Sequence, residues 1–116
     1  MKKATIYHNP RCSKSRQTLE LLQQHELAIN VVEYLQTPPD QQQLDELLQA
    51  LNCQPRDLMR KSEAEYKELS LDDDSLSREQ LIAAMVENPR LIERPIVSVD
   101  GKVAVGRPPE NILSIL

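Results

Sequence analysis

The first third of the chain alternates short apolar runs with one amphipathic stretch. Thr5-Ile6-Tyr7 favours β structure and predicts a strand over about residues 3–8. Asn9-Pro10 ends it, because a residue before proline avoids the helical region. A helix is then expected, capped by Ser13 or Ser15 and ending near residue 26, with Leu19, Leu22 and Leu27 on its apolar face. Residues 29–34 predict a second strand.

The middle of the chain has helical rather than strand periodicity. Four leucines spaced i, i+3, i+4, i+7 follow the breaker Thr37-Pro38-Pro39-Asp40, namely Leu44, Leu47, Leu48 and Leu51. Pro55 opens a further short helical segment, and Ser77 with Gln80 is typical of a capping box. The pattern therefore predicts three or four helices in succession.

The last quarter returns to β structure. Residues 96–99 are apolar and β-favouring, Asp100-Gly101 is the preferred two-residue hairpin turn, and residues 102–105 return as a strand. A short C-terminal helix follows Gly106-Arg107-Pro108-Pro109. The order β-α-β, helices, β-hairpin, α predicts a mixed four-stranded α/β sheet with a parallel first pair, because the first crossover contains a helix.

Composition narrows the class of protein. The 116 residues suit a single domain over 1–116. Fourteen basic against 18 acidic residues give a net charge of −4, which argues against a nucleic-acid partner. Apolar runs fall short of the ~18 residues that span a membrane, and Met1-Lys2-Lys3 leads into a β-like segment, so a cytoplasmic protein is expected. The two cysteines and two histidines lack zinc-ligand spacing, so neither a metal nor a bound cofactor is expected.

Cys12 is the strongest candidate for chemistry. It lies between a strand end and a helix start, where unpaired N–H groups favour an anion and lower the pKa of a thiol. Arg11, Lys14 and Arg16 make this segment basic in an acidic protein. Cys53, after the leucine-rich helix, is interpreted as structural. His8 could either tune the thiolate or form a hydrogen bond at the strand end.

Three arginines could complete an oxyanion site. Arg60 ends a helical segment, and Arg94 and Arg107 flank the hairpin strands, which can bring both to one end of the sheet. A planar guanidinium binds tetrahedral oxyanions through two hydrogen bonds. Solvated surface positions are the alternative for each of them.

Four short motifs in order resemble the glutaredoxin-coupled arsenate reductase family, the ArsC family, and most closely its short chromosomal YfgD-like branch. They are Ile6-Tyr7-His8-Asn9-Pro10…Cys12…Ser15-Arg16, Leu58-Met59-Arg60-Lys61, Glu93-Arg94-Pro95-Ile96-Val97 and Gly106-Arg107-Pro108-Pro109. The resemblance implies a thioredoxin-like fold with a helical insertion at about 39–90, between strands two and three. It also implies that Pro95 is the cis-proline that faces the active cysteine.

The resemblance further implies an arsenate reductase. Cys12 would be the nucleophile, Arg60, Arg94 and Arg107 the oxyanion ligands, and His8, Asn9, Ser15 and Pro95 supporting residues. The thiolate would form a covalent adduct with arsenate, glutathione would be the co-substrate, and glutaredoxin would resolve the adduct before arsenite leaves.

Two other functions remain open on the sequence. One is a monothiol glutaredoxin-like oxidoreductase, which would not need the three arginines. The other is an Spx-like regulator that binds RNA polymerase and senses redox state through a Cys-x-x-Cys pair. Ser15 stands where the second cysteine of that pair would be.

Overall fold

Four strands form one mixed sheet in the order β2-β1-β3-β4. In the computed structural model, which describes residues 1–116, they are β1 (Lys2–His8), β2 (Leu27–Glu33), β3 (Ile96–Val99) and β4 (Lys102–Val105). β1 pairs with β2 in parallel and with β3 antiparallel, and β3 and β4 form an antiparallel hairpin. The predicted class of sheet, with helices between its second and third strands, is confirmed.

The chain divides into two units. The first contains Met1–Thr37 and Arg94–Leu116, and the second contains Pro38–Glu93. The first holds the sheet, helix α1 (Ser13–Gln23) and the C-terminal 3₁₀ helix η3 (Pro109–Ile115), and the second holds the remaining helices. That residues 1–116 act as a single domain stays a prediction.

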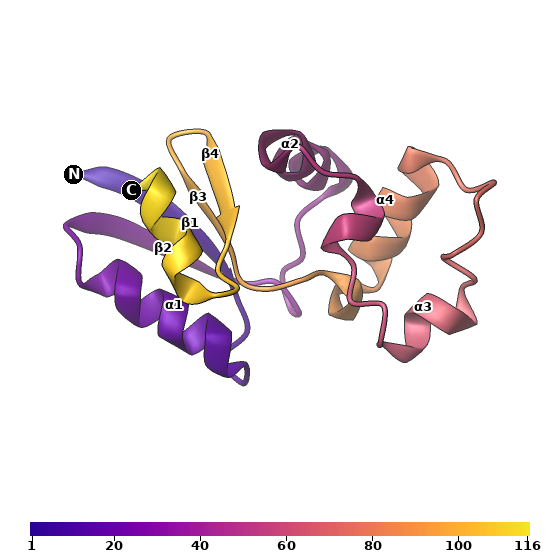
Figure 1. Cartoon of the computed structure of the whole chain (residues 1–116), viewed down its shortest axis with the longest axis horizontal. Coiled ribbons are helices and arrows are strands. Elements are labelled where there is room, and N and C mark those ends of the chain that lie inside the picture. Colours follow the sequence, from indigo (N-terminus) through magenta and orange to yellow (C-terminus); the bar gives the residue numbers. More distant parts are fainter. The chain divides into compact units, whose positions relative to one another are not determined.

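One face of the sheet carries the core of the first unit, beneath α1 and η3 (Figure 1). Alternate residues of a strand face the same side, so Ala4, Ile6 and His8 of β1 are all buried there. The other fully or nearly buried members of this cluster come from β3, α1 and η3, namely Val97, Val99, Leu22, Ile112 and Ile115. The register of β1 thus turns His8 toward the start of α1.

Helix α1 differs from its prediction in three respects. Its N-cap residue is Cys12, with no side-chain cap, rather than Ser13 or Ser15. The helix ends at Gln23, and Leu27 begins β2 instead of extending the helix. Its buried residues are Ser15, Thr18 and Leu22, and Leu19 is only partly buried, so the inner face of the helix is more polar than the leucine pattern indicated. The hydroxyls of Ser15 and Thr18 have hydrogen-bond partners, which makes this burial tolerable.

The β3–β4 hairpin has the predicted turn. Asp100 and Gly101 both have positive φ, 50° and 80°, as a type I′ turn requires. The peptide bonds Arg94–Pro95 and Arg107–Pro108 are both cis. The first confirms the expected cis bond at Pro95, whereas the second was not predicted.

The second unit is helical. It contains α2 (Gln41–Leu51), α3 (Ala64–Glu68) and α4 (Arg78–Glu87), with 3₁₀ turns η1 (Pro55–Leu58) and η2 (Pro89–Leu91). Asp40 caps α2, and Ser77 caps α4 in the predicted capping box with Gln80. Helix α2 packs against α4, and the buried residues of α2 are Leu44, Leu47 and Leu48. None of the helices has both the length and the apolar character needed to cross a membrane.

Candidate active site

Cys12 lies at the N-terminus of α1, with an extended backbone (φ −94°, ψ 123°) and a side chain only 9% exposed. Asn9 shapes the loop that leads to it. The backbone carbonyl of Asn9 accepts a hydrogen bond from the Cys12 N–H at 3.0 Å, and the side-chain Oδ1 of Asn9 accepts one from the Arg11 N–H at 3.0 Å. The strand end and the helix start are therefore joined by a tight turn that leaves Cys12 at the head of the helix.

The surroundings of Cys12 favour the thiolate. Burial raises the pKa of the Cys12 thiol, but the backbone N–H groups of Ser15 and Lys14, the charge of Arg94 and a hydrogen bond from Arg107 outweigh it, so the pKa is lowered. N–H groups at a helix start and nearby cations both stabilise negative charge. Cys53 behaves in the opposite way, because burial and the charge of Asp57 raise its pKa. The pKa values of the two thiols are therefore shifted in opposite directions, and the lowered pKa of Cys12 is the direction predicted from its place in the sequence.

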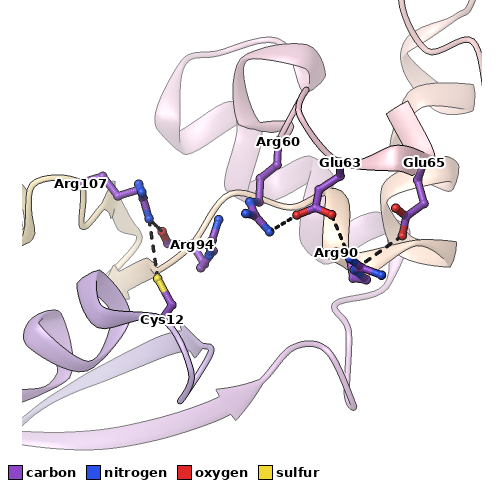
Figure 2. Close-up of polar contacts among 7 residues, drawn as sticks. All are labelled: Cys12, Arg60, Glu63, Glu65, Arg90, Arg94 and Arg107. Atoms are coloured by element: carbon purple, nitrogen blue, oxygen red, sulfur yellow. Dashed lines mark hydrogen bonds and ion pairs between the residues drawn. The ribbon is translucent and has the colours of Figure 1, made fainter. Parts of the chain in front are cut away.

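Arg107 and Arg94 lie at the same end of the sheet as Cys12. Figure 2 shows Nη1 of Arg107 pointing at the Cys12 sulfur, 3.8 Å away, and the same nitrogen donates to the Arg94 carbonyl at 3.3 Å. The two residues flank the hairpin, which brings them together although 12 residues separate them in the chain. Guanidinium charge next to a thiolate can both hold the thiolate and attract an anionic reactant.

His8 contacts Ser15 rather than the thiol. His8 Nδ1 and Ser15 Oγ share a buried hydrogen bond of 2.6 Å, and Ser15 Oγ also accepts from the Asn9 N–H at 3.0 Å. Burial lowers the pKa of His8. The charge of Glu33 raises it and the charge of Arg16 lowers it, but both effects are smaller than that of burial. His8 is therefore neutral near pH 7, and its contact fastens the first turn of α1 to the end of β1. Of the two roles left open by the sequence, the structure shows the hydrogen bond.

Gly106 permits the close approach that positions Arg107. Its N–H donates to the Pro95 carbonyl at 2.9 Å, and Thr18 Oγ1 lies 3.4 Å from the Gly106 carbonyl oxygen. A Cβ at this position would lie 2.9 Å from both Pro95 Cγ and Thr18 Cγ2. Thr18 and Gly106 were not among the predicted site residues. Gly106 stood in the Gly106-Arg107-Pro108-Pro109 motif, but only the fold shows its close contact with Thr18.

Arg60 belongs to the second unit, and its side chain contacts residues of that unit. Its Nη1 forms an ion pair of 2.6 Å with Oε1 of Glu63 (Figure 2). The other carboxylate oxygen of Glu63 pairs with Arg90 at 3.1 Å. The prediction that Arg60 and the Cys12 site act together stays a prediction.

Comparisons with known proteins match the whole chain. A model of the ArsC family matches residues 7–115. A protein named YfgD from Escherichia coli K12 is 55% identical over 116 residues, covering 99% of this chain and 98% of that one. An arsenate reductase of Neisseria meningitidis serogroup A is 47% identical over all of both chains. A solved structure named arsenate reductase from Vibrio cholerae is 50% identical, with a TM-score of 0.95 over 99% of this chain and 98% of that one.

Proposed function

This chain belongs to the ArsC family, and on that premise we propose that it reduces arsenate to arsenite, with glutathione and a glutaredoxin supplying the electrons. Relatives of nearly full length named arsenate reductase support the substrate. The observation that carries the proposal is the Arg107 guanidinium 3.8 Å from a sulfur whose pKa is lowered. A thiolate beside arginines suits attack on an anionic tetrahedral centre.

The first step forms a bond between the Cys12 sulfur and arsenic, and one oxygen of arsenate leaves as water after protonation. Arsenic remains As(V) in this adduct. The Cys12 thiolate and arsenate are both anionic, so their approach needs compensating positive charge. Arg94 and Arg107 supply it from the first unit, and the resemblance proposes Arg60 as a third ligand.

The reduction needs two external thiols, because Ser15 stands where a resolving cysteine would be. The glutathione sulfur then forms a bond to arsenic, and a second oxygen of arsenate leaves as water. The glutaredoxin thiolate then attacks the glutathione sulfur, so an S–S bond forms and the S–As bond breaks. Its electron pair stays on arsenic, which becomes As(III). Water then hydrolyses the Cys12–arsenic bond, which releases arsenite and restores the thiol.

The test is a coupled assay with arsenate, glutathione, a glutaredoxin and NADPH-driven glutathione reductase. We expect turnover that is lost in Cys12→Ser and retained in Cys53→Ser. The second variant is a matched control because the pKa of Cys53 is raised and Cys53 lies outside the Cys12 loop. A reactive Cys12 without arsenate turnover would contradict the proposal and favour thiol transfer instead.

The arginines are tested in the same assay. Arg94→Ala and Arg107→Ala should each lower kcat/KM for arsenate by about 10²–10³, corresponding to roughly 2.7–4 kcal/mol for the loss of one oxyanion donor. Lysine should restore only part of the activity, because an ammonium group cannot donate two parallel hydrogen bonds to an oxyanion. Full activity of either alanine variant would exclude that arginine from the site.

A further inference from the structure

The side chain of Arg60 is held by a carboxylate from its own unit. Arg60 Nη1 lies 2.6 Å from Glu63 Oε1, and the two side chains are 24% and 14% exposed. A charged pair that is partly shielded from water is stronger than one in free solution. The contact therefore restricts an arginine that would otherwise sample many rotamers.

The backbone of both partners is also fastened. The Arg60 N–H donates to the Leu91 carbonyl at 2.7 Å, and the neighbouring Met59 forms a β-bridge with Ile92. The Glu63 N–H donates to the Arg60 carbonyl at 3.1 Å, which closes a turn between the two residues. The ion pair thus joins side chains whose main chains are already held at fixed separation.

Arg90 occupies the second oxygen of Glu63. Its Nη2 lies 3.1 Å from Glu63 Oε2, and its Nε lies 3.9 Å from a carboxylate oxygen of Glu65 (Figure 2). Arg90 is 66% exposed, so it forms the outer end of the cluster, whereas Arg60 and Glu63 form its shielded part. Glu63 engages only Nη1 of Arg60. The donors on Nε and Nη2 can still bind an oxyanion.

We propose that Glu63 is a positioning residue, which holds the Arg60 guanidinium in the orientation that an oxyanion substrate needs. The inference rests on the proposed function, because it takes Arg60 as a substrate ligand. Glu63 itself does not touch the substrate. Because Glu63 already orders the Arg60 side chain, substrate binding does not pay the conformational entropy of ordering it. The substrate therefore binds more tightly.

The variant that tests this is Glu63→Gln, which keeps the size of the side chain and removes its charge. We expect KM for arsenate to rise about 2- to 12-fold, the range for losing the preorganisation of one flexible side chain, with a smaller change in kcat. Glu68→Gln is the matched control, at the last residue of the short helix α3, whose N-cap residue is Glu63. It makes the same change of charge at an exposed position and should leave KM unaltered.

A double-mutant cycle separates positioning from a general structural role. If Glu63 acts through Arg60, Glu63→Gln should have no further effect on KM in the Arg60→Ala background. Losses that multiply in the double variant would overturn the proposal. A fall in KM for Glu63→Gln would also overturn it, because Glu63 would then compete with the substrate for Arg60.

A readout that needs no turnover distinguishes this inference from the proposed function. NMR relaxation of the Arg60 Nε–H group should report a rigid side chain in the wild type and in Glu68→Gln, but a mobile one in Glu63→Gln. Equal rigidity in all three would refute the positioning role even if arsenate is reduced. Absence of arsenate turnover in the wild type would refute the proposed function, while the NMR comparison would still decide whether Glu63 orders Arg60.

Discussion

Replacing Gly106 with alanine adds one methyl group at a crowded point of the first unit. The new Cβ would lie 2.9 Å from Pro95 Cγ and from Thr18 Cγ2, and still nearer to Thr18 Oγ1. These are not free chain ends that can move aside. Thr18 is fully buried and donates to the Lys14 carbonyl at 2.7 Å, and Pro95 is joined to Gly106 by a backbone hydrogen bond.

The expected loss of stability follows from two opposing effects. Overpacking a close-packed site costs about 1–3 kcal/mol. Gly106 has an ordinary φ, so alanine would also restrict the unfolded chain and contribute about 0.4–1 kcal/mol in the stabilising direction. The net loss is about 1–2 kcal/mol, which lowers Tm by roughly 4–8 °C for a chain of this size.

The assay is thermal and urea denaturation of Gly106→Ala, Thr18→Ala and the double variant. Thr18→Ala removes two of the three atoms that the new methyl group meets, so the Gly106→Ala cost should shrink in that background. Because Gly106 precedes Arg107, alkylation of Cys12 should also slow in Gly106→Ala. An unchanged or raised Tm, or a cost that is the same with and without Thr18, would refute the argument from close contact.

Three further predictions concern the thiols, His8 and a helix cap. Iodoacetamide should alkylate Cys12 at pH values well below the free-cysteine pKa of about 8.5, and Cys53 only above it; similar pH profiles in the two single-cysteine variants would contradict this. Folding lowers the pKa of His8, so as the pH falls the imidazole is protonated in the unfolded chain before it is protonated in the folded chain. The free energy of unfolding should therefore decrease as the pH falls through the ordinary range of histidine pKa values. His8→Gln should show a smaller drop between about pH 7.5 and about pH 5 in denaturation experiments, and an equal drop would assign it to other groups. Ser77→Ala should cost about 1 kcal/mol in urea denaturation because Ser77 Oγ accepts from the Gln80 N–H, whereas Ser62→Ala, at an exposed position outside the helices, should cost little.

The order of the strands and helices followed from local patterns in the sequence. Some features depend only on residues that are neighbours in sequence. They are the alternation of buried and exposed residues along a strand, the Asp100-Gly101 turn and the Ser77 capping box, and each was found as expected. Helix α1 departed from expectation where polar groups are buried. Its inner face contains Ser15 and Thr18 because both hydroxyls have hydrogen-bond partners, His8 of β1 for Ser15 and the Lys14 carbonyl for Thr18, and an apolar pattern does not reveal such partners.

The candidate active site also has some features that the sequence determined and others that only the tertiary structure decided. The sequence by itself determined the candidate nucleophile, because a cysteine among cations at a strand-to-helix junction is a local feature. It also indicated the hairpin that carries Arg94 and Arg107. Only the tertiary structure decided that Arg107 reaches the Cys12 sulfur and that His8 binds Ser15. These contacts depend on which faces of separate elements meet, and that information lies in packing rather than in the spacing of residues along the chain.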